Sequence, residues 1–190
     1  MANQLQNFKV AILVTNGFEQ VELERPRMAL EDAGATTVLV APGDNHVQGM
    51  NHNEKGDKFT VDMLLKDANP DNFDGVLLPG GVVNADSLRM ETKAREFVQA
   101  VERSGKPIAV ICHGPWLLVS AGLVKGRHLT SYFTLQDDIR NAGGNWVDQE
   151  TIVDGNWVSS RKPDDIPAFN REMLQLFAHK QSNTRAVGMS

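Results

Sequence analysis

The stretch AVICHGPWLL, residues 109–118, contains the only cysteine of this 190-residue chain. An apolar run ends at Cys112, and His113, Gly114 and Pro115 follow it directly. A Gly-Pro pair suits a sharp turn into a helix, because proline at the first helical position loses no donor that the helix needs. The stretch therefore predicts a strand, then a turn that carries Cys112, then a helix.

Three further apolar runs share the composition of the segment before Cys112. They are nearly continuous in Val, Ile and Leu, which is typical of strands that are covered on both faces. The four runs are FKVAILV (8–14), TTVLVA (36–41), DGVLLPG (74–80) and KPIAVIC (106–112). Segments with helical spacing separate them, and two of these end on Gly34 and Gly105. This alternation predicts an α/β fold, a flavodoxin-like three-layer sandwich with a mostly parallel central sheet.

The rest of the chain continues this pattern. We expect a helix to about 121, a strand near HLTSYF (128–133), a helix in TLQDDIRNAGG (134–144), a hairpin that turns at Asp154-Gly155, and a last helix from about 163. The polar segment 46–58 is expected to be an exposed loop, and its His46 and His52 lack the companion ligands of a metal site. We expect one domain over residues 1–190, with a core at about 8–178 and a polar tail at 181–190.

Composition narrows the class of function. Nineteen Lys and Arg against twenty-four Asp and Glu give a net charge of −5, and no basic block attracts nucleic acid. One cysteine allows no intrachain disulfide, which fits a reducing compartment. The N-terminal sequence does not resemble a signal peptide, and no segment is apolar enough to span a membrane. We expect a cytoplasmic protein with no nucleic-acid or membrane partner and no metal or other cofactor.

Cys112 stands where an α/β fold places its ligands, beyond the carboxyl end of a strand. The order of strand, nucleophile, turn and helix is that of a nucleophile elbow, although Val110 replaces its first glycine. The positive end of the helix dipole favours a thiolate, so the sequence predicts a depressed pKa for Cys112. The alternative is a buried structural cysteine, which is common in protein cores.

Two other strand ends contribute to the same edge of the sheet. Gly80 and Gly81 allow a backbone amide to approach a ligand closely, and together with the His113 amide they could form an oxyanion hole. Glu19 follows the first strand, where an acid would repel phosphate; it either serves the site or caps the next helix. His113 cannot easily turn back on the adjacent cysteine, so we expect it to act towards the substrate or to be oriented by a group from elsewhere in the structure.

Five motifs together resemble a known family. They are VAILVTNGFEQVEL, LLPGGVVNADSLR, AVICHGPWLL, TSYFTLQDDIRNAGGNWVD and VSSRKPDDIPAFN, and they occur in the family's order over roughly residues 8–178. They resemble the PfpI family of the class I glutamine amidotransferase-like superfamily, which also includes the Parkinsonism-associated deglycase.

The resemblance implies roles for particular residues. Cys112 matches the nucleophile, His113 its neighbouring histidine, and Glu19 the carboxylic acid that hydrogen-bonds the thiol. Tyr132 matches a tyrosine that lines the pocket, and Asp86 matches a carboxylate, often glutamate in the family, that orients the histidine of an adjacent subunit. A homodimer, or a hexamer built from dimers, follows from that arrangement. Trp116 is expected to complete a small apolar wall with Tyr132, or to pack within its helix.

Three functions are consistent with these residues. The first is a cofactor-free enzyme that acts on a small carbonyl substrate such as methylglyoxal (glyoxalase III type), or on a glycated amine (deglycase type), in a stress response. The second is an intracellular cysteine peptidase. The third is a non-enzymatic stress sensor or chaperone in which Cys112 is oxidised. The sequence contains no long insertion that would cover the site, which favours small substrates over peptides.

Overall fold

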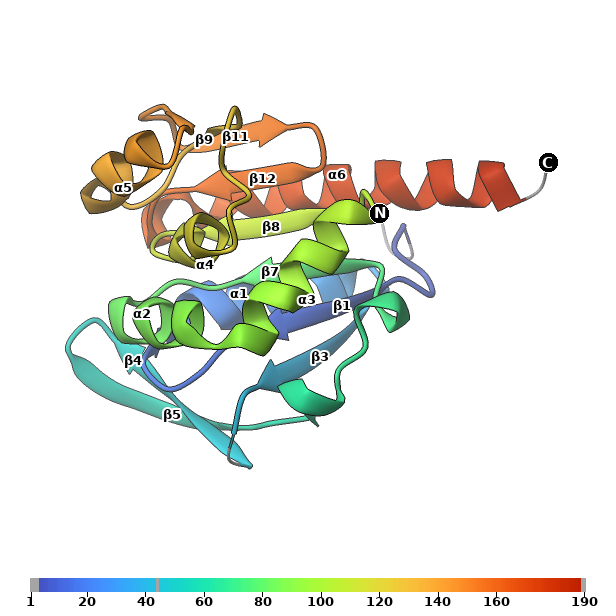
Figure 1. Ribbon diagram of the computed structural model, residues 1–190. Helices are drawn as coiled ribbons and strands as arrows, with labels where there is room; N and C mark the ends of the chain where they lie inside the picture. The colour runs from blue at the N-terminus through green and yellow to red at the C-terminus, as the bar shows by residue number, and fades with distance from the viewer. Residues whose placement is uncertain (1–3, 44, 189–190) are drawn as a thin grey trace.

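The computed structural model describes residues 4–43 and 45–188 and is built around one large sheet (Figure 1). The sheet has seven strands in the order β11-β12-β8-β7-β1-β3-β6. Every neighbouring pair is parallel except β11 and β12, which form an antiparallel hairpin. The predicted α/β sandwich with a mostly parallel central sheet is confirmed.

The elements alternate along the chain as the sequence predicts. The strands of the large sheet are β1 (Lys9–Leu13), β3 (Thr36–Ala41), β6 (Met63–Leu64), β7 (Gly75–Leu78), β8 (Ile108–Ile111), β11 (Thr151–Asp154) and β12 (Trp157–Ser160). The helices are α1 (Gln20–Asp32), α2 (Val82–Met90), α3 (Thr92–Arg103), α4 (Pro115–Ser120), α5 (Gln136–Asn141) and α6 (Ile166–Gly188). Two small sheets lie outside it, one of β2 (Phe18–Glu19), β4 (His46–Asn51) and β5 (Glu54–Thr60), the other of β9 (His128–Leu129) and β10 (Asn145–Trp146).

Helices cover both faces of the large sheet, which explains why β7 and β8, in the middle of the sheet, are apolar at every position. In β1, Val10 and Ile12 belong to the core that includes side chains of α1 and α6. The alternate residues Ala11 and Leu13 belong to a second core with side chains of α2, α3, α4 and α5. Successive strand side chains point to opposite faces, so a strand buried on both sides has no polar position.

Two local predictions are wrong. The segment 46–58 lies in the hairpin β4–β5 instead of a loop, because its backbone pairs with β2 and the Gln20 amide holds it from the core side. Gln20 Nε2 donates to Asp57 Oδ2 at 2.8 Å, and Gln20 Oε1 accepts from Asp57 N at 2.7 Å. The helical segment before Gly105 is two helices, since Glu91 has extended backbone between them (φ −72°, ψ 112°).

The last helix runs into the polar tail expected at 181–190. The helix α6 continues to Gly188 and carries the chain past the ends of β8 and β12 (Figure 1). Residues 189–190 lie outside the described part of the chain. Among the described residues, no helix combines the length and apolarity needed to cross a bilayer.

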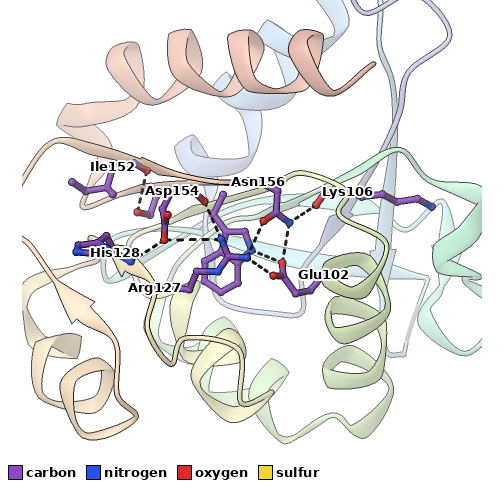
Figure 2. Close-up of polar contacts among 9 residues, drawn as sticks. Glu102, Lys106, Arg127, His128, Ile152, Asp154 and Asn156 are labelled. Carbon is purple, nitrogen blue, oxygen red and sulfur yellow. Dashed lines mark hydrogen bonds and ion pairs between the residues drawn. The ribbon is translucent and has the colours of Figure 1, made fainter. Parts of the chain in front are cut away.

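A polar cluster joins α3 to the β11–β12 hairpin at the amino-terminal end of β8 (Figure 2). The Arg127 guanidinium forms an ion pair with Glu102, donates to the Asp154 carbonyl at 3.0 Å and lies 4.5 Å from the centre of the Trp157 ring. Trp157 Nε1 donates to the same Glu102 carboxylate at 2.6 Å. Arg127 thus pairs with the largely buried Glu102 carboxylate and packs at the end of the sheet that is opposite Cys112.

We expect Arg127→Met to lower the free energy of unfolding by about 1–3 kcal/mol, because the variant leaves the Glu102 carboxylate without its cationic partner. Urea denaturation followed by circular dichroism measures the change. The control is Arg103→Met, an exposed residue of α3, the helix that carries Glu102, and this variant should change stability by less than about 0.5 kcal/mol. Equal stability of the two variants would contradict the role given to Arg127.

Candidate active site

Cys112 lies on a sharp turn between β8 and α4, as predicted. Its φ angle is +61°, a left-handed conformation that is rare for a residue with a side chain. Two backbone hydrogen bonds hold it there: Cys112 N donates to Ser160 O at 3.0 Å, and Tyr132 N donates to Cys112 O at 2.8 Å. The nucleophile elbow is therefore formed by β8 and α4 and anchored by the end of β12 and by the segment that follows β9.

The acid that interacts with the Cys112 thiol is Glu22, so the assignment to Glu19 is wrong. The Glu22 side chain is fully buried, and its Oε2 accepts the Gly80 N–H at 2.8 Å. Its Oε1 has no hydrogen-bond partner among nitrogen and oxygen atoms of the described residues, while the carboxyl interacts with the thiol. Glu22 lies on the buried stripe of α1 with Pro26 and Leu30, so a carboxylate at a core position of a helix was the signal in the sequence.

Glu19 instead lies at the rim of the site. It is in β2, and its carboxylate accepts the His52 N–H at 3.2 Å. The His52 ring is 3.9 Å from the same carboxylate and is 83% exposed. Glu19 therefore holds the turn of the β4–β5 hairpin beside the site, and it neither caps α1 through its side chain nor reaches the thiol.

The His113 ring turns toward Cys112, which contradicts the expectation that it faces away. Its Nδ1 is 3.1 Å from the Cys112 sulfur. One face stacks on Tyr132 with ring centres 4.7 Å apart, and Trp116 meets the ring edge-on at 5.6 Å. Trp116 and Tyr132 therefore fix the plane of the imidazole as well as lining the site.

Backbone amides supply positive charge at the sulfur. The N–H groups of Gly81 and His113 both interact with the thiol, which is the placement expected of an oxyanion hole. The Gly80 amide is used by Glu22 instead. A Cβ on Gly80 would stand 2.5 Å from Glu22 Oε2 and 2.6 Å from Cys112 Cβ, so only glycine lets these two side chains meet.

The site opens into a cleft of about 960 Å³ along the carboxyl ends of the strands. This is where open α/β sheets bind ligands. Three parts of its wall were not predicted from the sequence: the hairpin turn with Met50, His52 and Asn53, the side chain of Thr134, and the segment 162–164. Among the described residues no group of three or more His, Cys, Asp and Glu side chains is placed to hold a metal ion.

Asp86 does not join the site within one chain. It is exposed on α2 and is absent from the residues that line the cleft. Val82 and Val83, from the first turn of the same helix, do line the cleft and are 53% and 62% exposed. Any action of Asp86 on His113 therefore requires a second subunit.

Comparison with known proteins agrees with this geometry. The sequence model of the DJ-1/PfpI family matches residues 8–176. The chain belongs to the DJ-1/PfpI family. It is 42% identical over 168 residues to "Deglycase PfpI" of Pyrococcus furiosus, covering 88% of this chain and 98% of the relative. It is 40% identical over 169 residues to "Putative cysteine protease YraA" of Bacillus subtilis, covering 88% of this chain and 97% of that one.

Solved structures of the family share the fold. A two-domain protein from Anabaena variabilis, with DJ-1/ThiJ/PfpI-like and ferritin-like domains, superposes with a TM-score of 0.83 at 31% identity, over 89% of this chain and 48% of that one. Drosophila melanogaster DJ-1beta superposes with a TM-score of 0.82 at 24% identity, over 96% and 98% of the two chains.

Burial determines the protonation of this DJ-1/PfpI site. Burial raises the pKa of Glu22 to about 8, against the lowering effect of the Gly80 hydrogen bond. Burial, together with the neighbouring Glu22 charge, raises the pKa of the Cys112 thiol well above its ordinary value. The predicted depression of the thiol pKa is therefore wrong. Burial also lowers the pKa of His113 to about 4, so its ring is neutral at pH 7.

These pKa values predict how stability depends on pH. Between its ordinary pKa of 4.5 and the folded value of about 8, Glu22 keeps a proton that it loses on unfolding. Stability therefore falls as pH rises through this range. The lowered pKa of His113 makes stability rise with pH, but only below its ordinary value of 6.5. Above pH 6.5, of these two groups, only Glu22 therefore changes the free energy of unfolding with pH.

From pH 6.5 to 8 we expect the protein to lose about 1–2 kcal/mol of unfolding free energy through Glu22. Glu22→Gln, which cannot ionise, should show a much flatter profile. Urea denaturation at several pH values measures both. The control Glu24→Gln changes an exposed acid of the same helix and should keep the slope of the unsubstituted protein; a slope that survives in Glu22→Gln would contradict the assignment.

Proposed function

We propose that this protein is a cofactor-free, Cys112-dependent enzyme that acts on reactive carbonyls, either free methylglyoxal or its early adducts with amines. The observation that carries the proposal is a buried thiol at a strained elbow, with a neutral imidazole nitrogen 3.1 Å from its sulfur. A neutral Glu22 carboxyl and two backbone amides also interact with the thiol. A thiol nucleophile needs a base, an acid and donors for an oxyanion, and these groups provide one of each.

The reaction needs no outside oxidant. The thiol proton passes to His113 Nδ1, the sulfur bonds to the aldehyde carbon, and the carbonyl oxygen takes a proton to give a hemithioacetal. The hydrogen on that carbon then moves as a proton to the adjacent ketone carbon through an enediol, which leaves a lactoyl thioester. Water cleaves the thioester, and lactate leaves with restoration of the thiol. In the hemiaminal that methylglyoxal forms with an amine, the sulfur bonds to the former aldehyde carbon, the carbon–nitrogen bond breaks, and the thiol proton goes to the departing amine. The hemithioacetal that remains follows the same sequence.

The size of the cleft supports adducts as substrates. At about 960 Å³ it has room for a carbonyl carbon together with the side chain that it has modified. Several relatives at about 40% identity bear the name deglycase, which agrees with this proposal. One relative is named a putative cysteine protease, so peptide cleavage is the second candidate. We also propose a cytoplasmic location.

The test compares purified variants in three assays: loss of methylglyoxal, release of N-acetylarginine from its methylglyoxal adduct, and cleavage of a fluorogenic peptide. We expect Cys112→Ser to be inactive on both carbonyl substrates. Glu22→Gln should lower turnover by at least about tenfold, equal to about 1.4 kcal/mol, because proton transfer is lost while the fold is kept. Glu24→Gln is the matched control. Peptide cleavage without carbonyl turnover would replace this proposal with the second candidate.

We further propose that the protein acts as a homo-oligomer in which Asp86 of one subunit approaches the site of another. The smallest such assembly is a dimer, and the family resemblance implies a hexamer built from dimers as the larger one. The exposed Val82 and Val83 on the same helix give α2 an apolar surface suited to a second copy. The measurement mixes Cys112→Ser chains with Asp86→Ala chains after dissociation. Activity recovered in the mixed oligomer is the expected result, whereas full activity of Asp86→Ala alone would show that each site is complete within one chain.

A further inference from the structure

The His113 ring makes a second polar contact, on the side opposite the Cys112 sulfur, that the proposed reaction does not use. The ring Nδ1 faces the sulfur, and the ring Nε2 is 3.4 Å from Thr134 Oγ1. Thr134 also lines the cleft. A histidine that takes a proton at one nitrogen is held in the required tautomer by the partner of its other nitrogen, and within the chain that partner is the Thr134 hydroxyl.

Stacking against Tyr132 and Trp116 cannot by itself fix which nitrogen of His113 faces the sulfur. Tyr132 and Trp116 fix the plane of the imidazole, but a half-turn of the ring within that plane keeps the same stacking. Such a flip replaces Nδ1 by a carbon atom at the sulfur. Only a polar contact distinguishes the two orientations, and the contacts to the Cys112 sulfur and the Thr134 hydroxyl are both satisfied in one of them alone.

The turn that carries Thr134 is fixed to the nucleophile's own backbone. Thr134 lies in a short 3-10 helix, Phe133–Leu135, that directly follows Tyr132. Tyr132 N donates to Cys112 O at 2.8 Å, and Leu135 N donates to Tyr132 O at 3.0 Å. Leu135 is fully buried. The hydroxyl is therefore held in register with the thiol, although Thr134 is distant from Cys112 in the sequence.

We propose that Thr134 is a positioning residue for His113. Its hydroxyl oxygen accepts a hydrogen bond from His113 Nε2–H and so keeps the Nδ1 lone pair directed at the Cys112 thiol. The contacts form a line from the Glu22 carboxyl through the thiol and the imidazole to Thr134. The thiol, which keeps its proton at neutral pH, donates to Nδ1, and this requires the ring proton to be on Nε2. The effect on turnover depends on the proposed function, whereas the effect on the tautomer does not.

The experiment measures the tautomer directly by nitrogen-15 NMR of the imidazole nitrogens, with the His113 signals identified by their loss in His113→Asn. The unsubstituted protein should show His113 protonated on Nε2. Thr134→Val keeps the shape but removes the hydroxyl, and it should give a mixture of tautomers. Thr134→Ala, which adds no methyl group, should do the same, while Thr134→Ser should restore the original signals. Thr36→Val, at the distant start of β3, is the matched control and should change nothing.

Turnover supplies an independent reading. In Thr134→Val we expect kcat to fall about five- to tenfold with KM changed less than about twofold, and Thr134→Ser to restore most of it. A ring protonated on Nδ1 in the unsubstituted protein, or an unchanged tautomer in Thr134→Val and Thr134→Ala, would overturn the proposal. A tautomer that shifts in Asp86→Ala but not in Thr134→Val would assign the role to the neighbouring subunit. If no carbonyl is turned over at all, the proposed function fails while the NMR result still decides on Thr134.

Discussion

The interaction on which the site depends is the contact between the buried Glu22 carboxyl and the Cys112 thiol. Glu22 comes from α1, the Gly80 amide that it accepts comes from the loop after β7, and Cys112 comes from the end of β8. A carboxyl without exposure to water and with one hydrogen-bonded oxygen cannot easily be ionised. The fold therefore keeps a proton next to the thiol at neutral pH, and the same burial reduces stability as pH rises.

The thiol itself is a weak nucleophile at rest. Burial opposes its ionisation more than the amides of Gly81 and His113 favour it. In the proposed reaction the nucleophile therefore forms when a proton moves along a chain of adjacent groups, and no permanently ionised sulfur is needed. This arrangement protects a lone cysteine from unspecific chemistry and makes the orientation of His113 decisive, because its Nδ1 is the nearest acceptor for that proton.

Backbone geometry makes these contacts possible. The left-handed φ of Cys112 turns the side chain away from the strand direction, and such a conformation persists only where its surroundings hold it. Here the holding groups are backbone atoms of Ser160, at the end of β12, and of Tyr132, in the segment that follows β9. Across the cleft, Gly81 adopts φ +90° next to the Gly17 carbonyl. The end of β12 and the segments after β7, β8 and β9 thus meet at Cys112.

The sequence by itself determined the order of strands and helices, the parallel sheet and the position of the nucleophile. Continuous apolar runs mark strands buried on both faces, and a cysteine between such a run and a Gly-Pro pair marks the elbow; both signals are local. The sequence could not decide between Glu19 and Glu22, because Glu19 is directed by the pairing of β2 with β4 and Glu22 by the way α1 packs on the sheet. The turn of His113 onto the thiol, its contact with Thr134 and the hairpin wall of the cleft arise in the same way. Each depends on segments distant in sequence that only tertiary packing brings together, and local spacing carries no information about such contacts.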